Sequence, residues 1–213
     1  MKSWPILPSV IAAALLAGCS TTATMHYDLK SDQPGAAGQT AASQTATSPR
    51  AIQYRVTSLE VPESFDVETL IVRQPDNTLM MLSHDKWVGS LSEAMRNAIN
   101  ASLAKDMGLP PLPASMVSAQ QSTNVANIAI KVEHFDLQPA KQAGLSVLWQ
   151  VTLPGKERQT VTCYSTWTET VGPGVTALVS AQQRNVQQLA LQLAATLKTG
   201  KAPTTGNCQV GKA

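Results

Sequence analysis

Two stretches in the second half of the chain alternate apolar and polar residues, and this alternation constrains the fold more than any other feature. In residues 144–153 apolar side chains recur at every second position, and in residues 159–169 threonines occupy alternate positions. A period of two is that of a strand with one buried face. The turn-forming sequence Pro154-Gly155-Lys156 joins the two stretches, so we expect them to pair as an antiparallel hairpin.

Two further segments show the same alternation with a break in it. Residues 52–61 change phase along their length, which predicts a strand with a bend or bulge. Residues 124–137 alternate regularly until His134, where the apolar positions move to the other face. Both segments are predicted to join the sheet as irregular strands.

Shorter apolar runs complete the predicted strands. Residues 69–73 and 78–82 flank the turn sequence Gln-Pro-Asp-Asn, which predicts a second hairpin. Residues 25–29 alternate briefly and could add an edge strand.

Helical periodicity appears twice. Residues 91–106 carry an apolar stripe at three- and four-residue steps, and Ser90 with Glu93 forms a capping-box pattern in front of it. Residues 175–198 carry a second stripe, opposite a face rich in glutamine. The order of elements predicts a single α+β domain in which two amphipathic helices cover a mostly antiparallel or mixed sheet.

The first residues have the pattern of an export signal that ends in a lipidation site. Lys2 is followed by a short apolar stretch and by Leu16-Ala17-Gly18-Cys19. The stretch is shorter than the about 20 residues that span a bilayer. Cleavage between Gly18 and Cys19 would leave the Cys19 thiol to carry diacylglycerol; the alternative is an ordinary secretory signal with a chance cysteine. Because Ser20, not aspartate, follows, the expected address is the outer membrane.

These features divide the chain into four parts. We expect a signal peptide at 1–18, then a lipidated Cys19 with a short strand and a flexible linker at 19–50. The linker stretch consists of small and polar residues without a large apolar one. The folded domain is expected at 51–200 and a mobile tail at 201–213.

Two cysteines remain after processing, and an exported protein meets an oxidising compartment. Cys163 and Cys208 can therefore form a disulfide. The alternative is a buried, unpaired Cys163 and a free Cys208 in a mobile tail. No metal site is predicted, because the two cysteines are 45 positions apart and no histidine pair accompanies them.

Charge and motifs exclude several functional classes. Without Lys2, the 16 basic residues become 15 against 14 acidic ones, so no global field favours nucleic acid. The sequence contains no nucleophile elbow, phosphate-binding glycine loop or zinc-protease motif. His84 and Asp85, expected in the loop before the first helix, are the only acid–base pair, and we interpret them as surface residues. No enzymatic activity is expected, and no cofactor beyond the lipid on Cys19.

Two features suggest contact with a partner, and each has a second interpretation. The glutamine-rich face of the last helix, which includes Gln183 and Gln187, is either a solvent-facing surface or a contact for another subunit. Trp87, near the start of the first helix, is either an interface anchor or part of the core.

Several short motifs together resemble a known family. They are the segment Tyr27-Asp28-Leu29, the strand end Leu-Glu-Val-Pro at 59–62, the stretch from Trp87 through the Met-Arg-Asn helix to Leu103, and the strand end Val-Glu-His-Phe at 132–135. Over nearly all of its mature length the chain resembles the PqiC-type auxiliary lipoproteins of ABC-transporter and MCE systems.

The resemblance implies a non-enzymatic periplasmic subunit, anchored in the outer membrane, that works with a tunnel-forming MCE-domain protein spanning the periplasm. Such systems are linked to lipid transport between membranes and to membrane integrity. A homo-oligomeric ring is one arrangement that the chain could adopt. The alternatives are a component of another envelope assembly or secretion machine and, third, a periplasmic hydrolase.

Overall fold

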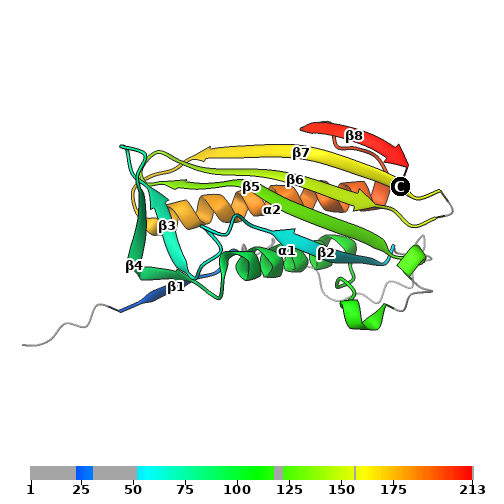
Figure 1. The fold of residues 1–213 in the computed structure, drawn as a ribbon, viewed down its shortest axis with the longest axis horizontal. Helices are drawn as coiled ribbons and strands as arrows, with labels where there is room; N and C mark the ends of the chain where they lie inside the picture. Colours follow the sequence, from blue (N-terminus) through cyan, green and yellow to red (C-terminus); the bar gives the residue numbers. More distant parts are fainter. Residues whose placement is uncertain (1–22, 31–51, 118–121, 156, 213) are drawn as a thin grey trace, which may run out of the picture.

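The computed structural model describes residues 23–30, 52–117, 122–155 and 157–212. These residues form strands, two α-helices and two short 3-10 turns (Figure 1), which confirms the predicted α+β class. The elements are β1 (Met25–Tyr27), β2 (Tyr54–Glu60), β3 (Thr69–Arg73), β4 (Leu79–Trp87), α1 (Leu91–Met107), η1 (Ala114–Met116), η2 (Ser122–Asn124), β5 (Ala126–Gln138), β6 (Gln142–Thr152), β7 (Gln159–Thr170), α2 (Val175–Thr199) and β8 (Asn207–Lys212).

The larger of two sheets has the strand order β2-β5-β6-β7-β8. The predicted hairpin of β6 and β7 is confirmed, with a continuous antiparallel register from Gln142↔Thr170 to Thr152↔Thr160. β2 is parallel to β5, so the sheet is mixed. α2 packs across β5, β6 and β7, and α1 packs against α2 and β2, so the helices and the sheet enclose one core.

The smaller sheet has the order β1-β4-β3 and lies at one end of the molecule (Figure 1, left). β3 and β4 form the second predicted hairpin, and the first residues of the described chain add β1 parallel to β4. The edge strand predicted at 25–29 is therefore present, in a shorter form. A single sheet was the sequence-based expectation, whereas the structure has two.

The irregularities predicted from changes of phase are confirmed. The register between β2 and β5 shifts between Val56 and Ser58. The register between β5 and β6 shifts between Val132 and His134. In each case an extra residue lets both halves of the strand keep apolar side chains on the core side.

Helix α1 begins as its sequence predicts. The backbone N–H of Glu93 donates to Ser90 Oγ at 3.4 Å, and the N–H of Ser90 donates to Glu93 Oε2 at 3.1 Å. Gly108 ends the helix with a φ of 70°, a left-handed conformation that favours glycine. Both helices lie within one residue of the predicted bounds at each end.

Residues 207–212 form β8, so the tail at 201–213, which was expected to be mobile unless Cys208 is bonded, contains a strand. β8 pairs antiparallel with β7, and Cys163 and Cys208 are directly opposite each other in this register. They form a disulfide, with 4.1 Å between their Cα atoms. The sequence showed no apolar periodicity here because backbone pairing and one covalent bond hold β8, while most of its side chains are exposed.

The hydroxyl of Tyr54 makes the stability of the fold depend on pH in the alkaline range. The side chain is 1% exposed and donates to the carbonyl oxygen of Leu109 at 2.7 Å. Burial, followed by the negative charge of Asp106, raises the pKa of Tyr54 to about 12. The unfolded tyrosine ionises near pH 10, so stability is complete below that pH and falls as the pH rises towards 12.

We therefore expect the free energy of unfolding to fall by roughly 2–3 kcal/mol between pH 9 and pH 12, the equivalent of two pKa units. Urea unfolding followed across this range measures the effect. A Tyr54→Phe variant should be less stable at neutral pH and should lack this part of the pH dependence. An unchanged alkaline slope in that variant would assign the effect to other groups.

Candidate functional site

Trp87, one of the two sequence-predicted contacts, belongs to the core. Its side chain is 2% exposed, and its ring meets that of Phe135 edge to face, with 6.0 Å between the centroids. Its backbone N–H donates to Glu68 O at 2.6 Å. Of the two interpretations of Trp87, the structure favours core packing over an interface anchor, because β4 runs as far as this residue and turns it inwards.

Gln183 holds the first described segment to the body of the protein. Its Nε2 donates to the carbonyl oxygens of Asp28 at 2.8 Å and Lys30 at 3.2 Å. Leu29, between them, is 1% exposed. The amide of Gln183 is thus engaged within the fold, where it joins α2 to the segment after β1.

The rest of the glutamine-rich face is partly buried and partly exposed. Gln182 is fully buried, and its Nε2 donates to Gly144 O at 2.9 Å in the sheet. Gln187 is half-buried and lines a small hollow between α1 and α2, of about 140 Å³. Gln188 is exposed and Gln192 is half-buried, so part of this face contacts the rest of the fold and part of it faces solvent.

His84 and Asp85 do not form a catalytic pair. Both lie in β4, where consecutive side chains point to opposite faces, and not in the loop that the sequence suggested. Asp85 accepts a hydrogen bond from the Tyr27 hydroxyl at 2.9 Å, which ties β1 to β4. Burial and the Asp85 carboxylate raise the pKa of Tyr27. Within the described ranges, no three His, Cys, Asp or Glu side chains gather as a metal site would require.

The lipidation site at Gly18 and Cys19 and the linker stretch to residue 50 lie outside the described residues, apart from residues 23–30. Among the residues that the structure does describe, no helix has the length and apolar character needed to cross a membrane. Met25, the first residue of β1, follows Cys19 by six positions. Cys19, the predicted lipidation site, is therefore separated from β1 by a very short stretch of sequence.

The face of the large sheet that points away from α2 is the most extensive candidate surface, and we call it the outer sheet face. The register brings residues of successive strands into rows across this face. Two neighbouring rows define it: Ser58, Ala129, Gln150, Thr162 and Gln209, and Glu60, Lys131, Leu148, Tyr164 and Asn207.

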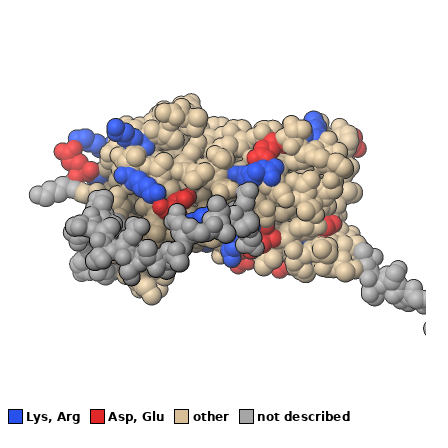
Figure 2. All heavy atoms as spheres, turned by 180° about the vertical axis from the view of Figure 1, so that it is seen from behind, with Lys and Arg blue, Asp and Glu red and all other residues tan. Residues whose placement is uncertain are grey.

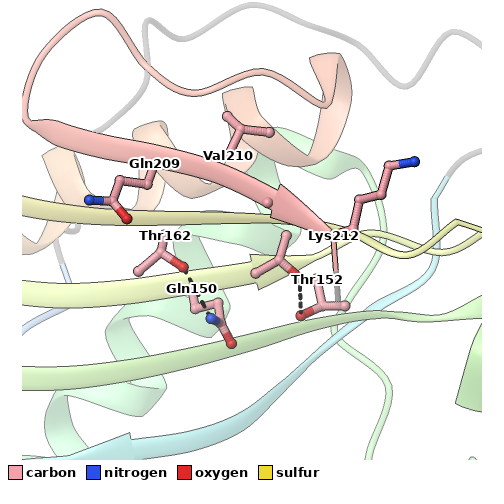
Figure 3. Close-up of a pocket in the computed structure, with 8 residues that line it drawn as sticks. Gln150, Thr152, Thr162, Gln209, Val210 and Lys212 are labelled. Atoms are coloured by element: carbon pink, nitrogen blue, oxygen red, sulfur yellow. Dashed lines mark hydrogen bonds between the residues drawn. The ribbon is translucent and has the colours of Figure 1, made fainter.

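The outer sheet face is shallowly hollowed in two places. One hollow, of about 290 Å³, lies over β6, β7 and β8, and Figure 3 shows the side chains that line it. Gln150 Nε2 donates to Thr162 Oγ1 at 3.0 Å there, so neighbouring strands are joined by side chains as well as by backbone. The second hollow, of about 220 Å³, lies over β2, β5 and β6 and shares Gln150 and Thr162 with the first.

An apolar spot lies in the middle of this face. Leu148 and Tyr164 are direct neighbours in the β6–β7 register and are 39% and 44% exposed. Lys131 lies beside Leu148, and its Nζ is 2.9 Å from Glu133 Oε1. The ammonium group of Lys131 donates a hydrogen bond to this carboxylate, and this bond and the negative charge of Glu133 raise the pKa of Lys131. An aromatic and an aliphatic side chain bordered by paired charges resemble the centre of a protein interface.

The charges on the surface do not favour a highly charged partner. On the face shown in Figure 2, acidic and basic side chains lie in small mixed groups on a largely uncharged background. A surface of this kind gives no strong single-sign field.

The alternating threonines of β7 indicated an exposed strand face in the sequence, but they did not by themselves indicate a binding surface. The threonines at alternate positions of β7 were correctly placed on the outward side, as the exposed side of a strand. Only the pairing of five strands shows that these residues meet Leu148 and Gln150 in one surface.

The model of the family described as "ABC-type transport auxiliary lipoprotein component" matches residues 27–194. A search of curated proteins found no match. A crystal structure described as an uncharacterized protein is 12% identical and has a TM-score of 0.59, with 82% of this chain and 98% of that chain covered. A Xanthomonas campestris protein of the family model DUF330 is 13% identical, with a TM-score of 0.48 and coverage of 70% and 87%.

Proposed function

Because the chain belongs to the family of ABC-type transport auxiliary lipoprotein components, we propose that it is a non-enzymatic subunit of an MCE/ABC-type system that transports lipid between membranes and maintains membrane integrity. In this proposal the lipid on Cys19 anchors it at the periplasmic face of the outer membrane. Its partner is the MCE-domain protein that spans the periplasm.

The observation that supports this function most is the integration of β1 into the fold. β1 pairs with β4, and Gln183 of α2 holds the residues that follow it. The long linker comes after β1 and leads to β2, so it does not lengthen the tether between Cys19 and the domain. A lipid on Cys19 would hold the whole domain close to the bilayer, as a docking subunit requires.

We further propose that the outer sheet face binds the MCE-domain partner. It combines exposed apolar side chains, hydrogen-bonding threonines and glutamines, and balanced charge. These are properties of non-obligate protein interfaces, in which a few central residues supply most of the affinity. The hydrolase alternative has less support, because Asp85 accepts a hydrogen bond from Tyr27 and follows His84 in a strand, where consecutive side chains point to opposite faces.

A matched pair of variants tests the docking surface. Leu148→Glu combined with Tyr164→Glu should reduce recovery of the MCE protein after in-cell crosslinking at least about tenfold, as expected when central interface residues are lost. The control is Leu191→Glu on α2, a residue that is 43% exposed and lies away from the outer sheet face. It should leave recovery unchanged. Melting curves of all variants should stay close to that of the wild type.

Two results would contradict the proposal. Equal recovery from both variants would mean that another surface binds the partner. Recovery of a secretion or assembly component, with no MCE protein from any surface, would support the alternative envelope function instead.

A homo-oligomeric ring is part of the proposal. A closed ring needs two different complementary faces on each subunit, because its contacts are heterologous. The mass of the detergent-solubilised lipoprotein, measured by light scattering, tests this arrangement. A monomeric mass at micromolar concentration would remove the ring from the proposal.

A further inference from the structure

Three consecutive large apolar side chains are exposed in the first part of β4. Leu79, Met80 and Met81 are 47%, 45% and 58% exposed, and we call them the β4 apolar edge. Consecutive strand residues point to opposite faces. Exposure of all three therefore means that solvent reaches both faces of the hairpin at this strand.

The pairing of the strands explains why the β4 apolar edge is exposed to solvent. Leu79, Met80 and Met81 pair with Arg73, Val72 and Ile71 of β3 on one side. On the other side, β1 pairs with β4 only at Asp85–Trp87, and within the described residues no strand continues it along Leu79–Met81. Exposed apolar edges are uncommon in soluble proteins because they invite contact with other surfaces.

The position of this edge identifies its partner. The hairpin of β3 and β4 and the strand β1 lie at the same end of the molecule (Figure 1). Six residues lead from Cys19 to Met25, a reach of at most about 20 Å when fully extended. Met25 is itself 55% exposed. A chain anchored at Cys19 therefore holds this end of the domain within one short tether length of the lipid.

We propose that the β4 apolar edge contacts the surface of the bilayer in which Cys19 is anchored. This inference rests on the proposed function, because it takes the lipid on Cys19 as given. The edge acts as a second membrane contact, and two contacts orient the domain where a single lipid anchor would leave it free to rotate.

The chemistry of the hairpin turn sets the depth of this contact. Asp76 accepts hydrogen bonds from the N–H of Thr78 at 3.0 Å and from its hydroxyl at 2.7 Å, so the turn is polar. A carboxylate is costly to move into hydrocarbon. The turn therefore stays among the lipid headgroups, while leucine and methionine side chains reach the boundary of the acyl chains.

Methionine oxidation tests the contact with the native chain. The lipidated protein is reconstituted in vesicles of phosphatidylethanolamine and phosphatidylglycerol and treated with hydrogen peroxide, and each methionine sulfoxide is measured by peptide mass spectrometry. The reference is the mature chain carrying Cys19→Ser, without vesicles. We expect Met80 and Met81 to oxidise at least about fivefold more slowly on vesicles, since oxidation follows exposure.

Met116 is the internal control. It is 69% exposed and belongs to η1, one of the short turns between α1 and β5 that lie at the opposite end of the molecule in Figure 1. Its oxidation rate should be the same in both samples. Equal rates for Met81 with and without vesicles would overturn the proposal, as would equal protection of Met116.

A photocrosslinking residue at Met81 distinguishes lipid from protein. Adducts with phospholipid in whole cells support the membrane contact, whereas adducts only with a second copy or with another protein overturn it. The mass of the N-terminal peptide reports separately whether Cys19 is lipidated. If Cys19 is not lipidated, the anchor in the proposed function is contradicted. The oxidation of Met81 in the unlipidated chain, measured with and without added vesicles, then tests the membrane contact of the β4 apolar edge by itself.

Discussion

Replacing Cys208 by serine is expected to lower the free energy of unfolding by about 4 kcal/mol, because the disulfide closes a 45-residue loop in the unfolded chain. For a domain of this size the melting temperature should fall by about 10 °C. Cys208 is the better position to change, since it is only half-buried. Cys163 is fully buried, and a serine there would add an unsatisfied hydroxyl to the effect.

Reduction of the wild type provides the matched control. Dithiothreitol should lower the melting temperature of the wild type to near that of Cys208→Ser and should leave the variant unchanged. A variant as stable as the oxidised wild type would show that the backbone pairing of β8 with β7 is sufficient without the covalent bond. If β8 detaches in the Cys208→Ser variant, the hollow over β6, β7 and β8 loses one of its walls. Recovery of the partner after crosslinking should then fall as well.

Replacing Cys19 by alanine is expected to abolish attachment to the outer membrane and function while leaving the fold intact, with the protein either soluble or still tethered by its signal. The described domain begins at residue 23 and contains none of the lipid, so its melting temperature should not change. Attachment should be lost because several acyl chains on one cysteine hold a protein at a bilayer, each buried CH₂ contributing about 0.8 kcal/mol. Membrane fractionation and complementation of a strain lacking the gene measure the two effects.

Ser20→Asp is the control for the address as distinct from the lipid. It should keep the lipid and move the protein to the inner membrane, where sucrose-gradient separation of the two membranes detects it. Full complementation by Cys19→Ala would show that the anchor is dispensable. Full complementation by Ser20→Asp, with confirmed relocation, would contradict the outer-membrane site of action.

Local features of the fold were predictable because local chemistry determines them. Ser90 and Glu93 mark the start of α1 and Gly108 its end, and the alternation in β6 and β7 gives both their existence and their pairing. The changes of phase in β2 and β5 also predicted register shifts correctly. Each of these signals lies within about fifteen residues of sequence.

Features that depend on distant pairing were not predictable from the sequence. The parallel pairs β1–β4 and β2–β5 join segments about 60 and 70 residues apart, which no local pattern records. The first of these pairs adds a third strand to the smaller sheet. Trp87 becomes part of the core because β4 extends to it, and this extension depends on β1 and β3 as neighbours.

In the candidate site, too, local features were predictable from the sequence and features that depend on distant contacts were not. The sequence predicted the export signal and its cysteine from a contiguous motif, and it assigned polar side chains of β7 to an exposed face. It did not show that Gln183 serves the fold, because the carbonyl groups of Asp28 and Lys30 that occupy its amide come from a segment about 150 residues earlier. Because the amide of a glutamine is uncharged, it can be either buried with hydrogen-bond partners or exposed, so the sequence pattern alone does not decide between the two.

The pairing of β1 with β4 has a mechanical consequence. A load applied to the chain before Met25 enters the fold through three residue pairs, Met25↔Asp85, His26↔Lys86 and Tyr27↔Trp87. A pull along the strand axis loads these pairs together as shear and does not open them one after another. The Tyr27 hydroxyl on Asp85 and the Gln183 amide on Asp28 and Lys30 spread the same load into the small sheet and the long helix. Tension from a moving membrane would thus reach the body of the domain and would not be absorbed by the linker that follows.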